Sequence, residues 1–366
     1  MNARELGGIV RQAVHGSSIA ARPRASRPAS IAASELPRVL DTADMAQRAM
    51  SWSVNLMAKA PVADVVAAAV AAEELGYDRC WVFDEGVMTR DVFVTLTAIA
   101  GATSRISIGP GITNPYVRHP GATAAAIASL DDVSGGRAFL GIGPGGGLAL
   151  GPLALDRVRP LAAVADTVAA CRALFAGEQV TMEGATFALA GARMGYARPD
   201  IEIIVAGRSP RITELGGRIG DGFYLSFPHK ELLDTQVRDL RRAADGRPFH
   251  VVWSTAVALN EADVEQVRSQ LTFRLVDSPV EVRNMLGLDD TRREQLRDAI
   301  ARGGPPAAAH LVDTAWVEHF AVVGDAASAQ DEIVRRCNVA GVDEFMVPVN
   351  DVGDLSAMTA LAPTTT

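Results

Sequence analysis

The sequence contains little cysteine, with three residues in a chain of 366. Cys80, Cys171 and Cys337 lie far apart and form no CxxC pair, which argues against a disulfide framework and against a thiolate metal site. The six histidines include no HExxH motif and no close pair. We therefore expect no protein-bound metal.

Lysine is almost absent as well, and it occurs only at Lys59 and Lys230. Nearly all the positive charge is arginine, and the formal net charge is -8. A nucleic-acid surface needs a dense basic face to displace counterions, so this balance argues against a nucleic-acid partner. No uncharged apolar run reaches the length of a membrane span, so we expect no membrane partner. The composition suits a cytoplasmic enzyme that acts on a small molecule.

The N-terminal segment, residues 1–45, has few acids and is rich in arginine, alanine and serine. This composition resembles a transit peptide, but the continuous apolar core of a secretory signal is missing. We expect a disordered or poorly ordered tail over residues 1–45, followed by one folded domain over residues 46–362.

From Ser51 onward, short apolar runs alternate with amphipathic or alanine-rich helical stretches, and 48% hydrophobic residues suffice for a large core. Strands that are apolar on both faces are typical of a parallel sheet covered by helices. Eight such units favour closure into a (β/α)8 TIM barrel over an open doubly wound sheet. The expected strands cover residues 51–57, 79–83, 105–109, 138–142, 201–206, 222–226, 250–256 and 344–347.

Two stretches exceed what a simple barrel needs. Residues 177–195 predict a hairpin insertion with Gly184 at its turn. Residues 261–336 are mostly helical and longer than one crossover requires. We expect them to form a helical insertion lobe between the seventh and eighth strands.

In such a barrel the active site lies at the C-terminal ends of the strands. Asn55 comes at the end of the first strand and Asp84 closes the second. Asp84 is a candidate for hydrogen bonding to a cofactor or positioning a proton, and the alternative is a structural ion pair with Arg90. His119 precedes Pro120 at a helix entrance, where it either touches substrate or cofactor or makes only a backbone hydrogen bond.

Two glycine-rich segments follow the third and fourth strands. Residues 109–115 contain two glycines and two prolines, which predict a bulge at the strand end, with a simple loop as the alternative. Residues 141–146 match GxGxxG, but a dinucleotide fingerprint needs a helix that starts within the motif, and residues 148–152 do not continue as a clean helix. We favour a glycine loop whose backbone amides approach a phosphate or a flat ring.

The fifth strand leads into Gly207, Arg208 and Ser209, followed by Pro210 at a helix start. Unpaired N–H groups at this start, a guanidinium and a hydroxyl make a suitable phosphate site. The alternative is an ordinary helix cap by Ser209.

Taken together, these segments resemble the luciferase-like monooxygenase superfamily, and within it most closely the coenzyme F420-dependent methylenetetrahydromethanopterin reductases. The resemblance covers most of the chain from Ser51 to about Leu361. It rests on Gly76-Tyr77-Asp78 with Trp81-Val82-Phe83-Asp84, Arg90-Asp91-Val92-Phe93, Thr95–Ala100, Gly109–Tyr116, Arg118-His119-Pro120, Ser134-Gly135-Gly136-Arg137 and Leu140-Gly141-Ile142-Gly143.

The resemblance implies a luciferase-like barrel with a deazaflavin across its strand ends. It also implies a non-proline cis peptide in the third-strand bulge behind the ring, for which the matching bond here is Gly111–Ile112. The residues expected to contact the cofactor are Gly111, Ile112, Thr113, Asn114, Gly143, Gly145, Gly207, Arg208 and Ser209. The candidate catalytic residues are Asp84, Asn55 and His119, and of these Asp84 and Asn55 are expected to line the substrate side.

Two positions depart from the reductase pattern. Glu85 stands where the reductases often have His, and Asn55 stands where they have Glu. Both lie where substrate would be handled, so the departures bear on the pterin substrate rather than on the cofactor.

We therefore expect an F420-dependent oxidoreductase that transfers a hydride between the deazaflavin and an organic substrate. The first alternative is an FMN-dependent luciferase-like monooxygenase, because FMN carries a similar phosphate. The second is a non-catalytic barrel that serves as a binding protein. The resemblance also implies a homodimer.

Overall fold

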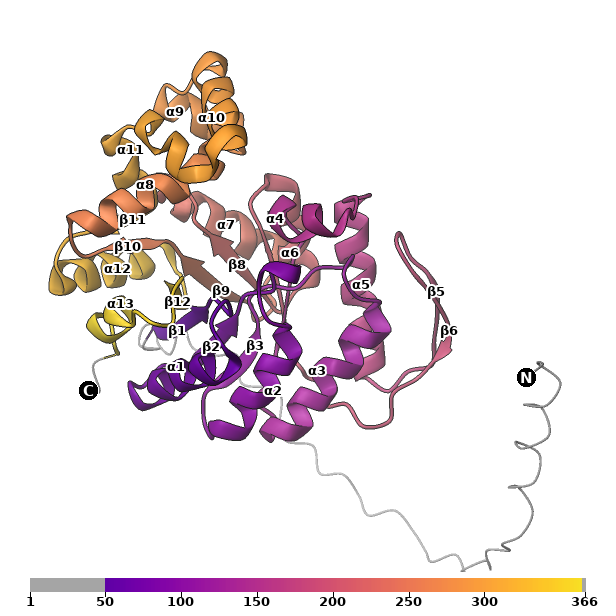
Figure 1. Ribbon diagram of the computed structural model, residues 1–366. Coiled ribbons are helices and arrows are strands. Elements are labelled where there is room, and N and C mark those ends of the chain that lie inside the picture. The colour runs from indigo at the N-terminus through magenta and orange to yellow at the C-terminus, as the bar shows by residue number, and fades with distance from the viewer. Residues whose placement is uncertain (1–49, 364–366) are drawn as a thin grey trace, which may run out of the picture. The chain divides into compact units, whose positions relative to one another are not determined.

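The computed structural model describes residues 50–363, so the expected N-terminal tail over residues 1–45 lies outside the described residues. Eight parallel strands form one sheet in the order β3-β2-β1-β12-β9-β8-β7-β4 (Figure 1). They are β1 (Ser51–Leu56), β2 (Arg79–Val82), β3 (Ser107–Pro110), β4 (Leu140–Ile142), β7 (Ile203–Gly207), β8 (Gly222–Ser226), β9 (His250–Ser254) and β12 (Glu344–Val349).

The two edge strands, β3 and β4, meet and close the sheet into a barrel. Ile108 bridges Ala138, and further along Thr113 bridges Ile142, both in parallel. Between these bridges β3 advances by one residue more than β4 does, which is the signature of a β-bulge. The predicted TIM barrel and the predicted bulge at the end of the third strand are both confirmed.

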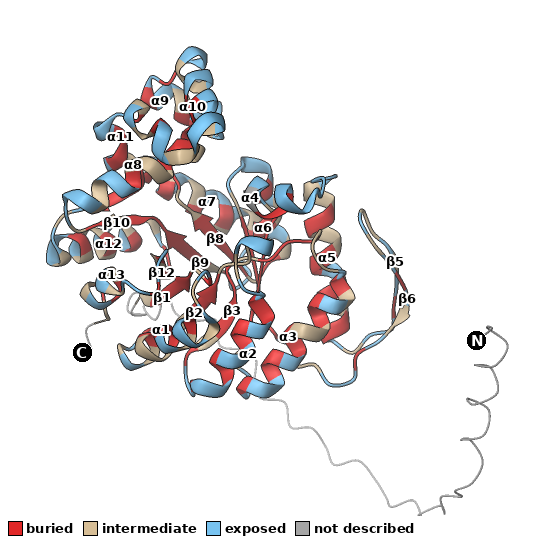
Figure 2. Cartoon of the chain, viewed as in Figure 1, coloured by how far each residue is buried: buried red, intermediate tan, exposed pale blue. Residues whose placement is uncertain are grey.

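Helices cover the outside of the barrel and turn their buried faces toward the strands (Figure 2). Several begin with a side-chain cap, such as Asp91, whose carboxylate accepts from the Phe93 and Val94 amides. The helices that flank the strands are α1 (Val62–Glu74), α2 (Val92–Ala102), α3 (Pro120–Ser134), α5 (Pro160–Phe175), α6 (Pro210–Ile219), α7 (Leu233–Ala244), α12 (Ala326–Ala340) and α13 (Ser356–Ala360). None of the helices among residues 50–363 combines the length and the hydropathy needed to cross a bilayer.

Short helical turns occupy the loops between these elements, and their bounds are η2 (Gly86–Met88), α4 (Gly147–Leu150), η3 (Gly151–Leu153) and η4 (Lys230–Leu232). The expected hairpin insertion is confirmed as antiparallel β5 (Val180–Glu183) and β6 (Ala188–Ala192). Its turn begins at Gly184, whose amide donates to the Phe187 carbonyl at 2.8 Å.

Between β9 and β12 the chain forms a helical lobe with its own hydrophobic cluster, which includes Leu271, Leu296 and Trp316. The elements of this segment are β10 (Ala256–Ala258), α8 (Glu261–Val276), α9 (Val280–Leu286), α10 (Asp290–Ala308), η5 (Ala309–Leu311), α11 (Thr314–Phe320) and β11 (Ala321–Val323). The range expected for the lobe, residues 261–336, also takes in most of α12, which packs against α7 and β12.

Seven side chains fill the barrel interior as a separate hydrophobic cluster, with Trp81 against Phe139 at 4.4 Å between ring centroids. The other members are Ile204, Ala206, Tyr224, Val252 and Met346. Because side chains alternate along a strand, every second residue counted from these members also faces inward.

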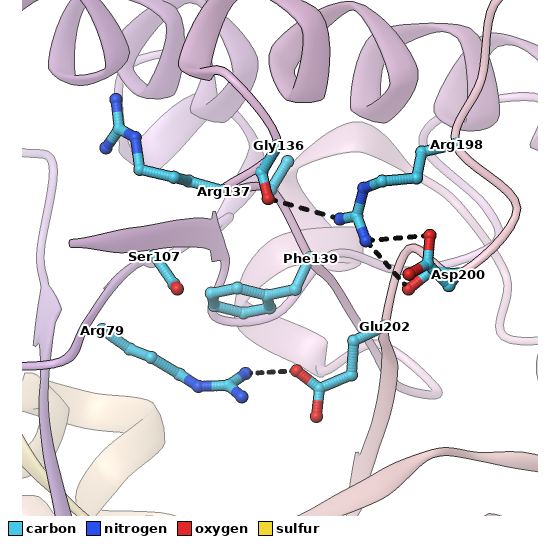
Figure 3. Close-up of a pocket in the computed structure, with 9 residues that line it drawn as sticks. Arg79, Ser107, Gly136, Arg137, Phe139, Arg198, Asp200 and Glu202 are labelled. Atoms are coloured by element: carbon cyan, nitrogen blue, oxygen red, sulfur yellow. Dashed lines mark hydrogen bonds and ion pairs between the residues drawn. The ribbon is translucent and has the colours of Figure 1, made fainter. Parts of the chain in front are cut away.

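Below this cluster, at the N-terminal ends of the strands, lies a buried charged network. Glu344 has no exposed surface and accepts from His250 at 2.7 Å and from the Trp81 indole at 3.1 Å. Arg79 lies 3.1 Å from Glu344 and 2.6 Å from Glu202. Figure 3 shows Arg79 and Glu202 at a cavity of about 170 Å³ at this end of the barrel. This cavity is therefore at the end opposite to the expected active site.

Glu344 provides a test of how much this network stabilises the barrel. Burial alone raises the pKa of Glu344, but the charge of Arg79 and the hydrogen bond from His250 outweigh it and lower the pKa from 4.5 to about 2. The carboxylate therefore stabilises the fold above pH 4.5, and this contribution is lost as the pH falls toward 2. We expect Glu344→Gln to lower the free energy of unfolding at pH 7 by about 3 kcal/mol, because it leaves Arg79 without its buried partner.

Urea denaturation at pH 7 and at lower pH measures both effects, since the variant should also lose stability less steeply below pH 4.5. Glu202→Gln is the matched control, because Glu202 is partly exposed and should contribute about 1 kcal/mol or less. Equal losses in the two variants would contradict a network centred on Glu344.

Candidate active site

The top of the barrel is lined by the last inward-facing residue of each strand. Asn55 on β1 is fully buried, and its amide nitrogen donates to the Gly111 carbonyl at 2.8 Å. Its Oδ1 atom has no partner among residues 50–363, as is also true of Oγ of the fully buried Ser254 on β9. Buried polar atoms are rarely left unpaired, so these two indicate a place where a ligand completes the hydrogen bonding.

The Gly111–Ile112 peptide bond is cis, at the position that the resemblance implied. A Cβ on Gly111 would lie 2.7 Å from Cβ of Trp81 and 2.8 Å from Oδ1 of Asn55. Only glycine therefore fits here. The bulge is held on one side by Asn55 and on the other by β4, where the Thr113 amide donates to the Gly141 carbonyl at 3.0 Å.

Asp84 lies beside this bulge. Its carboxylate accepts from the buried Thr113 hydroxyl at 2.7 Å. Burial raises the pKa of Asp84, and the hydrogen bonds from Thr113 and the Gly86 amide offset this only in part. The alternative ion pair with Arg90 is wrong, since Arg90 donates to the Lys59 carbonyl instead. Asp84 is a partly buried carboxylate at the barrel mouth.

The loop after β4 also depends on glycine. A Cβ on Gly143 would lie 2.3 Å from the Ile112 side chain and 2.8 Å from the Ala206 carbonyl oxygen. Gly145 has a φ of +71°, a conformation that other residues rarely adopt. The Asn114 side chain caps the adjoining turn by accepting from the Tyr116 amide at 3.0 Å. Gly143, Ile112 and Asn114 thus form one packed wall of the mouth.

Only the single-turn helix α4 and the short turn η3 follow this loop, and the next long helix, α5, begins at Pro160. A dinucleotide fingerprint needs a long helix that starts within the glycine motif. The GxGxxG match is therefore not a Rossmann motif.

Across the mouth, β7 ends at Gly207 and α6 begins at Pro210. A Cβ on Gly207 would lie 2.3 Å from the Ile212 side chain, so strand and helix pack too closely for any larger residue. Ser209 caps α6 by accepting from the Ile212 amide, which leaves its hydroxyl hydrogen free to donate. Arg208 is exposed and forms no ion pair or hydrogen bond among the described residues.

His119 is the expected site residue that the structure does not bring to this mouth. Its Nδ1 accepts from the Gly121 amide at 3.1 Å, and its Nε2 lies 3.1 Å from the Ala188 carbonyl oxygen on β6. The ring also packs edge-on against Phe187 at 5.6 Å. Both ring nitrogens are engaged with backbone groups, so His119 caps α3 and anchors the hairpin, in agreement with the alternative of a backbone hydrogen bond and not with a catalytic role.

Glu85, expected where substrate is handled, lies at the mouth together with three residues that were not among the expected site residues: Tyr224, Ser254 and Arg274. Burial raises the pKa of both Glu85 and Tyr224, and the charge of Arg208 opposes the rise in each. Arg208 is therefore close to Glu85 in the loop after β2 and to Tyr224 on β8. Strand alternation would have identified Ser254, but nothing in the sequence links Arg274, in the lobe helix α8, to the barrel.

A closed eight-stranded barrel with a bulged third strand, a glycine-lined wall and a polar mouth is the architecture of a TIM-barrel enzyme. A sequence profile described as luciferase-like monooxygenase matches residues 49–344. The chain belongs to this luciferase-like family.

Characterised relatives cover most of the chain. It is 32% identical over 262 residues to the 5,10-methylenetetrahydromethanopterin reductase of Methanolobus tindarius, which is 69% of this chain and 80% of the relative. An F420-dependent glucose-6-phosphate dehydrogenase of Beutenbergia cavernae is 35% identical to this chain, and the matched region covers 44% of this chain and 51% of the dehydrogenase. The relatives are enzymes, and so is this protein.

Among solved structures, the coenzyme F420-dependent tetrahydromethanopterin reductase from Methanopyrus kandleri is similar with a TM-score of 0.76 and 26% identity, covering 86% of this chain and 97% of that chain. An F420-dependent secondary alcohol dehydrogenase, in complex with an F420-acetone adduct, has a TM-score of 0.68 at 18% identity, with 86% and 98% covered. The second likeness shows the fold alone.

The Asp84–Thr113 hydrogen bond leads to a prediction about proton affinity. The Thr113 hydroxyl lowers the pKa of Asp84 against the effect of burial, so Thr113→Val should raise that pKa further. Carboxyl carbon NMR over a pH titration measures it, with the Asp84 resonance assigned from its loss in Asp84→Asn. An unchanged midpoint would mean that Thr113 does not stabilise the ionised form.

Proposed function

We propose that this protein is a coenzyme F420-dependent oxidoreductase that transfers a hydride between the deazaflavin and an organic substrate. The similarity to F420-dependent reductases over most of the chain supports the cofactor. The observation that carries the proposal is the arrangement of the mouth. The Gly111–Ile112 bulge, backed by Asn55, lies on the β3 side, and the Gly207–Ser209 turn lies on the β7 side.

The residues at the mouth fit such a cofactor. The unpaired Oδ1 of Asn55 and the unpaired Oγ of Ser254 would find partners in a polar ring system. The close-packed wall of Gly143 and Ile112 leaves a surface on which a flat ring can lie. Arg208 and the Ser209 hydroxyl offer donors to a phosphate at the start of α6.

When bound, the deazaflavin would supply the carbon that gives or accepts the hydride. The chain's own residues would bind and orient. Ile112 and Gly111 support one face of the ring, Asn114 and Gly145 shape the loops beside it, and Gly207 lets α6 approach closely. On the substrate side, Asp84 manages the proton, because its raised pKa brings the protonated form closer to neutral pH.

The substrate differs from the pterin of the reductases. Glu85 and Asn55 stand where the resemblance implied His and Glu, so the charged groups on the substrate side are placed differently. An FMN-dependent monooxygenase is the second candidate, and one structural neighbour at a TM-score of 0.62 and 17% identity is a monooxygenase in complex with FMN. The Gly207–Ser209 turn suits the phosphate of either cofactor, so binding measurements must decide between F420 and FMN.

Titration of the purified chain with each cofactor tests the proposal. We expect quenching of deazaflavin fluorescence with a Kd in the micromolar range, about -8 kcal/mol, and weaker binding of FMN. Riboflavin, which lacks the phosphate, is the control for ring stacking alone. Tight binding of FMN without binding of F420 would favour the monooxygenase, and failure of both would favour a non-catalytic barrel.

A second test addresses Asp84. Asp84→Asn keeps the hydrogen bond from Thr113 but cannot exchange a proton, so F420 binding should be unchanged and hydride transfer slower by about 10²-fold to 10⁴-fold. Single-turnover bleaching of F420 with substrates found by screening measures the rate. A loss of affinity in place of rate would show that Asp84 serves only to bind.

A further inference from the structure

Two arginines lie together where the lobe meets the barrel mouth. Gly207 on β7 pairs with Leu225 on β8, so Arg208 follows at the level of Ser226. The lobe helix α8 places Arg274 at the same level, where its Nη2 donates to the carbonyls of Ser226 and Phe227. The Arg274 guanidinium also lies 5.3 Å from the centroid of the Phe227 ring.

Neither arginine has an acidic partner in contact. No ion pair within residues 50–363 involves Arg208 or Arg274, although most of the other arginines of this range are paired. Asp277 and Glu85 act on them only at longer range. Burial lowers the pKa of Arg274, and the positive charge of Arg208 lowers it further. Two neighbouring cations repel each other and Asp277 offsets this only from a distance, so an anion in contact with both arginines would stabilise the arrangement.

The free donors of both arginines lie at the level of Ser226 on β8. Arg274 uses only Nη2 in its hydrogen bonds to the described residues, so Nη1 and Nε remain free to donate to a ligand. Arg208 spends none. Ser226 pairs in register with Ser254, whose fully buried Oγ is unpaired and lies on the inward face of β9. A guanidinium held by backbone carbonyls at a fixed position is suited to bidentate binding of an oxyanion.

We infer that Arg274 and Arg208 together form an oxyanion subsite between the helical lobe and the barrel, which takes a phosphate or carboxylate group. The inference deepens the proposed function, because it assigns a binding role to the lobe and gives Arg208 a partner. The oxyanion has two possible sources, the phosphate and carboxylate tail of the cofactor or an anionic group of the substrate. The shared chemistry is a planar or tetrahedral oxyanion that both arginines contact.

The first experiment compares F420 with the deazaflavin riboside that lacks the phosphate and the acidic tail. If the oxyanion belongs to the cofactor, Arg274→Gln and Arg208→Gln should each weaken F420 binding by about tenfold to hundredfold and leave riboside binding unchanged. The double variant should lose less than the product of the two single losses, because both side chains bind one group. Arg297→Gln, on an exposed face of the lobe helix α10, is the matched control.

A second arm covers a substrate oxyanion. Inorganic phosphate should then raise the thermal midpoint of the wild-type chain, with or without F420, and should not raise that of Arg274→Gln or Arg208→Gln. The Arg208 variant guards against misfolding, since that side chain makes no described hydrogen bond and its loss removes nothing structural.

The outcomes separate the two proposals. If the wild-type chain binds neither deazaflavin, the proposed function fails, and the phosphate arm alone decides on the subsite. If the deazaflavins bind and both arginine variants bind F420, the riboside and phosphate as the wild type does, the subsite is refuted. Lowered affinity for F420 and for the riboside by the same factor would also overturn it, because that pattern reflects a disturbed fold in place of a lost anion contact.

Discussion

The extra residue in β3 opposite β4 is the constraint on which the rest of the site depends. Closing a barrel requires its two edge strands to pair, and here they pair at Ile108 and again at Thr113 with a bulge between. The bulge brings the backbone of β3 against the interior, which is possible only because glycine stands at the points of contact. A Cβ on Gly141 would lie 2.1 Å from the Pro110 carbonyl oxygen. The same packing directs the Thr113 hydroxyl toward Asp84, so the position of the Asp84 carboxylate depends on the pairing that closes the barrel.

Much of the fold could be predicted from the sequence because its signals are local. The eight apolar strands, the bulge at 109–115 and the hairpin turn at Gly184 follow from periodicity and from residues with restricted backbones. The direction of the His119 side chain could not be predicted, because it does not depend on a local signal. Its position before Pro120 indicates a helix start but not a direction, and the direction was decided by the hairpin carbonyl of Ala188, 69 residues away in the chain. Arg274 could not be found at all, because its contact with Ser226 joins segments 48 residues apart that share no pattern.

The two departures from the reductase pattern change side chains, and the glycines that allow close backbone packing are present. Gly111, Gly143 and Gly207 stand where close approach demands glycine, whereas Asn55 and Glu85 are the two positions at which the resemblance to the reductases implied other residues. A cofactor supported mainly by backbone and small residues would tolerate such replacements, because only a small part of its support depends on them. A substrate held by side chains would not. Such a separation would let one barrel fold keep a cofactor while its substrates change.

The two ends of the barrel treat buried charge in opposite ways, and the contrast locates the ligand. At the N-terminal end, Arg79 lies between Glu202 and Glu344, and Arg137 donates to the backbone carbonyls of Ala100, Thr103 and Ile106. Both of these cations have partners on the protein, because Arg79 is ion-paired with two carboxylates and Arg137 is held by backbone carbonyls beside the cavity of Figure 3. At the C-terminal end, Arg208 and Arg274 have free donors, and Asn55 and Ser254 have unpaired polar atoms. Ion-paired arginines thus lie at the N-terminal end, and arginines with free donors lie at the C-terminal end, which is the end where a barrel of this kind binds its ligand.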